Sequence, residues 1–440
     1  MWEDYVKKYE ATTPKSKELY KRALKVMPGG ISHNIRFFPP HPFYTVKARG
    51  SKIWDVDGNV YTDYWMGHMA LILGHSPEYV VKRVGEQIEN GLHFGTVNPY
   101  ALELAEAIQR NLPSAEMVRL GCSGTEATMY AVRLARAYTS RRIVVKAEGG
   151  WHGGNPILHK AVSIPYDKPD SLGIIEEEQR FTRTIPVNDV DGSEPILNEC
   201  REDLACIIVE PVIGSGCIPL DRDYLIYLRE VCDRYNAVLI FDEVITGFRL
   251  GLSSAQGFYR VKPDLTTLGK IIGGGFPIGA VAGLSEILKL ADPTSGRKWE
   301  KCWIGGGTFS CNPMSSIAGL ATIEFLEKNA DQVYGKINRL GEEARRGIDK
   351  ALSGLKSLNA KTTGAGSLLL THFLKERGGI KSPRDRLKTD LEVQRNFYIA
   401  LITHGVFFLP GHAGAISYAH TEEEIKRLIE AVEKIAEEAR

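Results

Sequence analysis

The sequence predicts an α/β protein, with a large domain built on a mostly parallel, doubly wound sheet and a smaller α+β domain formed by both ends of the chain. Short apolar runs rich in β-branched residues, at 143–145, 204–209 and 237–241, suit strands that are buried on both faces. Segments 125–138 and 222–235 carry apolar residues at helical spacing. Strands that alternate with helices are typical of βαβ units, which build parallel sheets.

The two ends of the chain have a different pattern. Residues 43–64 form two alternating segments around Asp57-Gly58, which predicts a hairpin. From about residue 331 the chain is charged and helical, and Thr421 before three glutamates is a helix start. We expect helices at 333–350, 390–403 and 421–440. The expected domains are 1–65 as the N-terminal segment of the small domain, 66–330 as the large ligand-binding domain, and 331–440 as the C-terminal small domain.

One stretch, 156–186, is the longest without a clear period. We expect a long loop there. Loops of this length are uncommon in compact domains, and many of them act as lids.

Composition excludes several classes of protein. The chain has 440 residues, 43% of them hydrophobic and 25% charged, with a net charge of +1. This balance argues against nucleic acid or an acidic membrane surface as a partner. The first residues include early acids and form no apolar run, and no stretch approaches about 18 apolar residues, so we expect neither a signal peptide nor a membrane span. The seven cysteines are an odd number without a CxxC pair, which favours a reduced, cytoplasmic setting over disulfides or a metal site.

A lysine inside an apolar, glycine-rich stretch is the first candidate for chemistry. The segment LTTLGKIIGGG, 265–275, places Lys270 among small and apolar residues. An amine withdrawn from water favours its neutral form, and a neutral amine forms a Schiff base with an aldehyde. The alternative is a structural lysine whose ammonium reaches water from a strand end.

A carboxylate at a strand end is the second candidate. In FDEVITGFR, 241–249, Asp242 closes an expected strand. Ligands of open α/β sheets lie at the carboxyl ends of the strands, so Asp242 is suited to hold a cationic ring nitrogen. The alternative is that Asp242 and Glu243 are merely a pair of surface acids.

Small residues before a helix form a candidate phosphate site. Ser123, Gly124 and Thr125 precede the helix expected at 125–138. Backbone N–H groups at a helix N-terminus bind phosphate, although the same residues also serve as ordinary helix caps. The pattern is neither GxGxxG nor GxxxxGK[ST], which argues against a dinucleotide or a P-loop nucleotide.

Two further glycine-rich segments add candidates. In GGWHGGN, 149–155, Trp151 could stack on a planar ring with His152 beside it, or pack in the core. In GGGTFSCNP, 305–313, Thr308 could supply another phosphate donor, or the segment could be a simple turn before a helix from Pro313. An amine for an aldehyde, an acid for a ring nitrogen, an aromatic ring and a phosphate site together describe pyridoxal 5'-phosphate (PLP). A non-catalytic nucleotide- or ligand-binding α/β protein is the alternative from another class.

The motifs SGTEATM, FDEVITGFR and LTTLGKIIGGGFPIGA resemble those of the class III, fold-type I PLP-dependent aminotransferases. Within that family the chain is most similar to the glutamate-1-semialdehyde 2,1-aminomutases. The similarity runs from PGG at 28–30, through DVDGNVYTDY and ILGH, to GTFSCNP and AHTEEEI, and so covers nearly the whole chain.

The resemblance implies a role for each matching residue. Lys270 would form the Schiff base and move protons, and Asp242 would pair with the pyridine nitrogen. Val244 and Trp151 would contact the two ring faces, with His152 beside them and Glu210 near the ring. Arg36 would bind a substrate carboxylate, for which a guanidinium fork is suited, although the alternative is an ordinary solvated arginine. The phosphate contacts would be Ser123, Gly124, Thr125 and, from the second subunit of a homodimer with its site at the interface, Thr308.

Several positions depart from the aminomutase pattern. Ser215 stands where an asparagine contacts the cofactor hydroxyl, and His68 replaces a tryptophan. His33 replaces the serine before the substrate arginine, and PGHAGAISY lacks a glutamate, with His412 nearby. Most of the cofactor residues match, while many of the residues expected around the substrate differ, which leads to the hypothesis that the substrate is not glutamate 1-semialdehyde.

Three outcomes of amino-group chemistry remain open at this level. A transferase would pass the amine through pyridoxamine phosphate to a second oxo acid. An isomerase would return it to the neighbouring carbon of the same substrate, as in the synthesis of 5-aminolevulinate for tetrapyrroles. Racemisation or decarboxylation would use the same cofactor residues.

Overall fold

The computed structural model describes residues 1–355, 359–376 and 378–439. Its backbone divides into two compact units. The terminal unit comprises Met1–Pro77, Lys336–Ile380 and Lys388–Arg440, and the central unit comprises Glu78–Gly335 and Lys381–Leu387. The domain boundaries expected after residues 65 and 330 stay a prediction. The two compact units of the backbone meet in sequence after residues 77 and 335.

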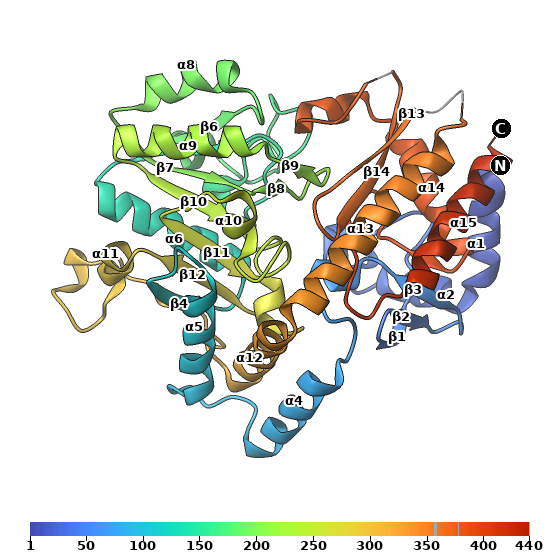
Figure 1. Ribbon diagram of the computed structural model, residues 1–440, viewed down its shortest axis with the longest axis horizontal. Coiled ribbons are helices and arrows are strands. Elements are labelled where there is room, and N and C mark those ends of the chain that lie inside the picture. Colours follow the sequence, from blue (N-terminus) through green and yellow to red (C-terminus); the bar gives the residue numbers. More distant parts are fainter. Residues whose placement is uncertain (356–358, 377, 440) are drawn as a thin grey trace. The chain divides into compact units, whose positions relative to one another are not determined.

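A seven-stranded sheet forms the middle of the central unit (Figure 1). All of its strands run parallel except β12, which is antiparallel to both of its neighbours. The predicted α/β fold with a mostly parallel sheet is thereby confirmed. In spatial order the strands are β4 (Met117–Gly121), β12 (Gly279–Gly283), β11 (Leu265–Gly269), β10 (Val238–Asp242), β7 (Leu204–Val209), β5 (Ile143–Ala147) and β6 (Thr182–Ile185).

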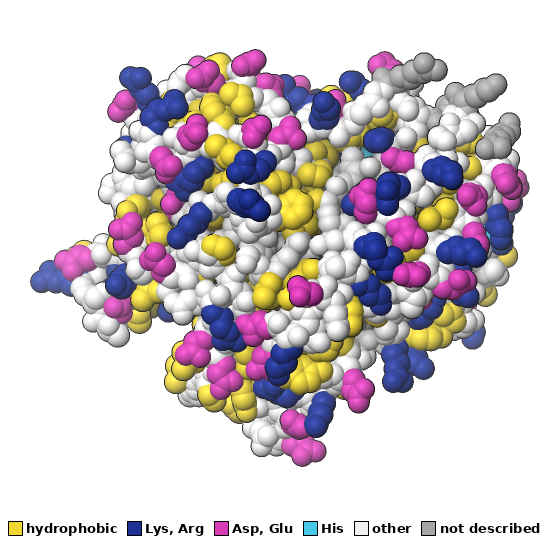
Figure 2. All heavy atoms as spheres, viewed as in Figure 1, with side chains coloured by type: hydrophobic (Ala, Val, Ile, Leu, Met, Phe, Trp, Pro, Cys, Tyr) yellow, Lys and Arg dark blue, Asp and Glu magenta, His cyan; other side chains and the backbone are white. Residues whose placement is uncertain are grey.

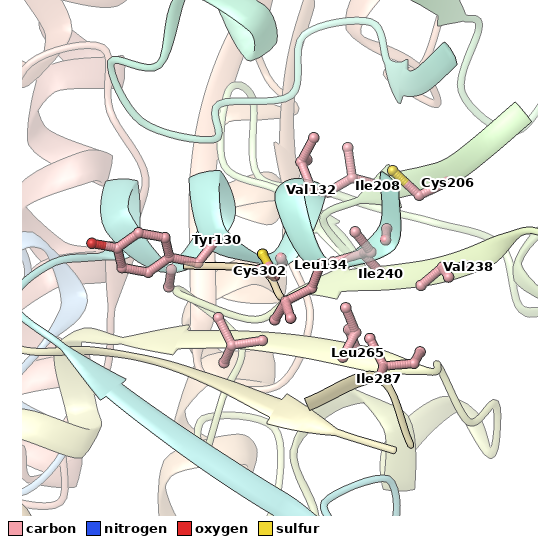
Figure 3. Packing of buried hydrophobic residues seen from close by; sticks show 14 of the residues in the cluster. Tyr130, Val132, Leu134, Cys206, Ile208, Val238, Ile240, Leu265, Ile287 and Cys302 are labelled. Atoms are coloured by element: carbon pink, nitrogen blue, oxygen red, sulfur yellow. The ribbon is translucent and has the colours of Figure 1, made fainter. Parts of the chain in front are cut away.

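Helices cover both faces of this sheet. On one face α6 (Gly124–Thr139) packs across the middle strands, and its Leu134 lies with Ile240 and Leu265 in one apolar cluster (Figure 3). The alternate residues Leu239 and Phe241 are buried on the other face, where α9 (Arg222–Tyr235) packs on β7 and β10. Burial on both faces explains why the strands read as continuous apolar runs.

The remaining elements of the central unit surround the sheet. The expected helix from Pro313 is present as α12. The helices are α4 (Glu78–Asn90), α5 (Pro99–Asn111), α7 (Glu176–Gln179), α8 (Val190–Cys200), α10 (Ser254–Tyr259), α11 (Ser285–Leu288) and α12 (Pro313–Lys328), and a small pair of strands is β8 (Val212–Ile213) and β9 (Ile218–Pro219).

The loop expected over 156–186 is interrupted by regular structure. Its last residues, Thr182–Ile185, form β6, the edge strand that pairs with β5, and a short helix, α7, precedes them. The prediction was wrong for these residues, because a four-residue edge strand is too short to show a period. A 3-10 turn also forms at Pro156–Leu158, so the irregular part of the segment is 159–175.

The terminal unit joins both ends of the chain. The predicted hairpin is confirmed by β2 and β3, which pair antiparallel around Asp57-Gly58, and β15 adds to β3 from the far end of the chain. The helices expected in the last third are also present, and the side chain of Thr421 caps α15 by accepting from the Glu424 amide. The elements are α1 (Trp2–Thr12), α2 (Pro14–Ala23), β1 (Thr45–Arg49), β2 (Lys52–Asp55), β3 (Val60–Asp63), α3 (Met66–Met69), α13 (Ala330–Leu352, which begins in the central unit), β13 (Asn359–Thr363), β14 (Leu368–Leu374), α14 (Leu391–Thr403), β15 (Val406–Phe407), β16 (Gly414–Ala415) and α15 (Glu422–Glu438).

The surface carries both signs of charge. On the face shown in Figure 2, basic and acidic side chains are interspersed without a broad patch of one sign. Across the described residues, none of the helices is long and apolar enough to cross a membrane.

Candidate active site

Lys270 follows β11 directly at the carboxyl end of the sheet. Its backbone has a φ of +48°, a left-handed conformation that is strained for a residue with a side chain. The side chain is half-buried, and removal from water lowers the pKa of its amine, while the charges of Asp242 and Glu210 oppose that shift. A half-buried amine with a lowered pKa is suited to nucleophilic and base chemistry, and it does not fit a lysine that simply reaches solvent.

The glycines after Lys270 have a packing reason. Gly274 has a φ of +57°, and a Cβ there would lie 2.3 Å from the Ala318 carbonyl oxygen of α12. Gly269, on the other side of the lysine, would bring a Cβ within 3.3 Å of Val244. The backbone at Gly274 therefore passes too close to α12 for a larger side chain, and a side chain at Gly269 would be tightly packed against Val244.

Asp242 is the last residue of β10 and is buried. Its Oδ1 accepts hydrogen bonds from the Val244 amide and the Thr267 hydroxyl, both at 3.1 Å. Its Oδ2 lies 2.7 Å from Nδ1 of His152. Three donors thus hold this carboxylate at the strand end, which is the environment expected of an acid that faces a cationic ring.

His152 is the buried partner of Asp242. Burial lowers the pKa of its ring, and because a carboxylate oxygen accepts, Nδ1 carries the donated proton. Its Nε2 has no hydrogen-bond partner among the described residues. The sequence places His152 beside Trp151, but the bond to Asp242 joins residues 90 positions apart and has no local signal.

Two buried glutamates lie near this pair of residues. Glu210 accepts from the amides of Trp151 at 2.8 Å and Gly214 at 3.1 Å, and burial together with Asp242 raises its pKa to about 8. Glu243 is fully buried and accepts from the Ala255 amide at 2.6 Å, and burial raises its pKa to about 7. The alternative that residues 242 and 243 are surface acids is therefore wrong.

The candidate phosphate site lies at the start of α6. The Ser123 hydroxyl accepts from the Glu126 amide at 3.2 Å and so caps the helix, as the structural alternative predicts. A Cβ on Gly124 would lie 3.0 Å from both methyl groups of Val244. The helix start is thus packed against the loop that follows the Asp242 strand.

The remaining candidates of the central unit lie in loops. Trp151 is 47% exposed, which excludes core packing, and its ring meets the edge of the His159 ring at 5.2 Å. Thr308 is exposed. Ser215 accepts a short hydrogen bond from Arg386, a residue that the sequence does not flag, since it lies 171 positions away.

The terminal unit holds the candidate substrate residues. Nε of Arg36 lies 3.5 Å from Nε2 of His68, and the ring of His68 is 5.2 Å from His33 and 4.5 Å from Trp65. His412 reaches the same Trp65, with ring centres 5.9 Å apart. Burial and the Arg36 charge lower the pKa of His33. Arg36 and Trp65 also line an aromatic cavity of about 360 Å³ within this unit.

The segment that carries His68 is strained. Met66, Gly67, His68 and Met69 have consecutive φ values of +46°, +57°, +62° and +64°. Three of them have side chains, and left-handed backbone costs such residues free energy that the surrounding packing must offset. Backbone strain of this kind is concentrated at functional sites, which supports His68 as a candidate substrate-binding residue.

The central unit fits PLP. The fit rests on three features of the structure: a half-buried amine with a lowered pKa, a buried carboxylate held by three donors, and a helix start packed against that carboxylate's loop. These suit, in order, an aldehyde, a protonated ring nitrogen and a phosphate.

Comparison with known proteins agrees with this fit. The family model described as Aminotransferase class-III matches residues 38–435. The glutamate-1-semialdehyde 2,1-aminomutase of Methanothermobacter thermautotrophicus is 42% identical over 425 residues, which cover 96% of this chain and 98% of that protein. Among solved structures, an omega-transaminase from Sphaerobacter thermophilus is 32% identical with a TM-score of 0.89, and a transaminase with PLP bound is 32% identical with a TM-score of 0.88; each alignment covers 97% of this chain and 98% of the other.

Proposed function

Because this chain belongs to the class-III aminotransferase family and is a PLP-dependent enzyme, we propose that it transfers an amino group between a carboxylate-bearing amino acid other than glutamate 1-semialdehyde and an oxo acid. Membership of this family sets aside the alternative of a non-catalytic binding protein. The observation that carries the substrate proposal is the set of contacts around Arg36 and Ser215, where the partners are His68 and Arg386.

Each residue of the central unit has one task in this proposal. When bound, PLP supplies an aldehyde for the substrate amine and a ring that accepts electrons. Lys270, as a neutral amine, would take the proton from the carbon of the amino acid and, in the reverse half-reaction, give a proton to the carbon of the oxo acid. Asp242 keeps the proton on the ring nitrogen, and His152 orients Asp242. Val244 and Trp151 would hold the two faces of the ring.

The phosphate and the substrate are held by other groups. The helix start at Ser123, Gly124 and Thr125 binds the phosphate through backbone N–H groups. Arg36 binds the substrate carboxylate, because a guanidinium forms two parallel hydrogen bonds to a carboxylate. Thr308, which is exposed, contacts the phosphate of the partner subunit in a homodimer. The cysteine usage supports a cytoplasmic setting for the same enzyme.

Glutamate-1-semialdehyde 2,1-aminomutase activity is the second candidate. It is favoured by the name of a relative that is 42% identical along nearly the whole chain. Such a reaction requires the intermediate to stay bound, and the segment before Glu176 would then have to close over the site. Racemisation or decarboxylation has no separate observation in its favour.

Product analysis separates the two candidates. The holoenzyme is given glutamate 1-semialdehyde, α-amino acids and β-amino acids, each with and without an added oxo acid. A transaminase stops after one half-reaction when no acceptor is present, whereas an aminomutase forms 5-aminolevulinate catalytically without one. Efficient acceptor-free formation of 5-aminolevulinate would reject the proposal in favour of the second candidate.

A further inference from the structure

A short segment from the last quarter of the chain, 381–387, packs against the candidate active site. It belongs to the central unit although the chain on both sides of it belongs to the terminal unit. Arg384 in this segment forms a two-bond salt bridge to Glu148, with distances of 2.6 and 2.8 Å. A Cβ on Gly149 would lie 2.6 Å from Cβ of Pro383. The segment is therefore held directly against the loop that carries Trp151 and His152.

A second arginine of this segment lies on the neighbouring loop. Nη1 of Arg386 donates to the Ser215 hydroxyl. Its Cδ is 2.8 Å from the position that a Cβ on Gly216 would take, so a glycine is needed there for the arginine to approach. Ser215 follows Gly214, whose amide donates to Glu210. Arg386 thus contacts the loop that also closes on the buried Glu210.

The guanidinium of Arg386 has few partners. A guanidinium carries five N–H donors, and the Ser215 hydroxyl is the one acceptor that Arg386 bonds among the described residues. Its Nε is buried without an acceptor. Burial lowers the pKa of Arg386, and the titratable group that acts on its charge is the phenol of Tyr166. No described carboxylate forms an ion pair with it, and Glu148 is already bonded to Arg384.

The contrast with Arg384 indicates what Arg386 lacks. Both arginines lie in the same seven-residue segment, and Arg384 is paired although 56% of its side chain is exposed. Arg386 is the more buried of the two and has no anionic partner among the described residues. A largely buried cation without a counter-charge is unfavourable, so such a group is expected to act on an anion that arrives with a ligand.

We propose that Arg386 is an anion-recognition residue that binds a carboxylate of the amino acid or oxo acid reacting at Lys270. Ser215 holds one edge of the guanidinium, which leaves the other N–H groups to form the fork that a carboxylate accepts. The proposal rests on the proposed function, since it concerns the same site. It also gives Ser215 a role that differs from contact with the cofactor hydroxyl.

Binding of an unreactive carboxylate tests this role. The probe is glutarate, titrated calorimetrically into the PLP-loaded enzyme, with Arg386→Gln as the test and Lys381→Gln as the control. Lys381 is an exposed cation of the same segment, so its loss removes the same charge at nearly the same place. We expect glutarate affinity to fall at least about tenfold in Arg386→Gln and to stay within about twofold in Lys381→Gln, in line with charge-assisted hydrogen bonds.

Two further variants keep the result interpretable. Arg386→Lys keeps the charge but loses the fork, so we expect a loss of about three- to tenfold; this variant carries the test if Arg386→Gln does not fold. Ser215→Ala should cost less than Arg386→Gln, because it frees one edge of the guanidinium without removing the charge. If Ser215→Ala costs more, Arg386 only positions Ser215 and the proposal fails.

The visible absorption of bound PLP distinguishes failure of the proposed function from failure of the role proposed for Arg386. A preparation that takes up no PLP would overturn the proposed function. The role of Arg386 alone is rejected if every variant shows the wild-type absorption band and Arg386→Gln binds glutarate within twofold of wild type. The same holds if neither the wild type nor Arg386→Gln binds glutarate.

Discussion

Asp242 and Arg36 are both charged residues with proposed roles in one reaction, but their surroundings differ. Asp242 is 3% exposed and is bonded by a ring nitrogen, an amide and a hydroxyl at 2.7 to 3.1 Å. Arg36 is exposed, and the partner of its Nε is His68 at 3.5 Å. The Asp242 carboxylate is held in one position by its three donors. The Arg36 guanidinium has more freedom to adapt to what it binds.

This difference bears on where a sequence can change at low cost to the fold. A residue whose partners are buried strand ends and backbone amides cannot change without disturbing all of them. A residue at an exposed cluster can change with little cost to the fold. The buried Asp242 is of the first kind and the exposed His33 is of the second, whereas His68 and His412 are half-buried against Trp65. Substrate choice is therefore expected to vary at the Arg36 cluster while the cofactor chemistry stays constant.

The largest effect is expected at Lys270, on the buried side of the comparison. Lys270→Ala removes both the amine and the base, so turnover should fall at least about 1000-fold. Lys262→Ala, an exposed lysine of the same region, serves as the control. Steady-state assays with the best substrate of the panel give the ratio. A Lys270→Ala enzyme with more than a tenth of wild-type turnover would contradict the proposed base.

Asp242→Asn should follow, with a loss of about 100- to 1000-fold in turnover. Asparagine can still accept from Val244 and Thr267, so the fold should be retained, but the negative charge at the ring nitrogen is lost. Circular dichroism and the melting temperature check the fold, and single-turnover kinetics measure the loss. An unchanged rate in a folded variant would mean that the buried network has no role in the chemistry.

A smaller effect is expected on the exposed side. Arg36→Ala should lower kcat/KM about 10- to 100-fold, chiefly through KM, because a charge-assisted pair to the substrate carboxylate is lost. The cofactor absorption should not change. Arg49→Ala removes another exposed arginine of the terminal unit and should have little effect. A lower kcat with unchanged KM would place Arg36 in the chemical step instead of in substrate binding.

The smallest effect on turnover is expected at Glu243, which is buried but bonds to α10 and not to the reacting groups. Its pKa is about 7 in the folded protein, above its value of 4.5 in the unfolded chain. A carboxyl group with a raised pKa stabilises the fold fully below about pH 4.5, and this contribution is lost as the pH rises to about 7.

Glu243→Gln should therefore flatten the pH dependence of the melting temperature between pH 4.5 and 7, by a few degrees at most. Scanning calorimetry across this range gives the slope. Glu199→Gln, an exposed acid on α8, should keep the wild-type slope. Equal slopes for Glu243→Gln and wild type would show that burial does not raise the pKa of Glu243 as described.

Local sequence patterns were sufficient to place Lys270 after a strand, Asp242 at the end of a strand and Ser123 before α6. In each of these the signal is a strand followed at once by the functional residue, or small residues followed at once by a helix, and such patterns lie within about fifteen residues. The hairpin at Asp57-Gly58 and the cap at Thr421 are local in the same sense. The resemblance to a known family then supplied the roles.

Contacts between distant parts of the chain were decided by the tertiary structure. The bond from His152 to Asp242 depends on which loops the strand order brings together at the carboxyl ends of the strands. Arg386 reaches Ser215 because seven residues of the last quarter of the chain return to the central unit. The edge strand β6 pairs with β5, 35 or more residues earlier in the chain. Sequence spacing carries no information on such pairs, since their distance is set by strand order and loop path and not by the residues between them.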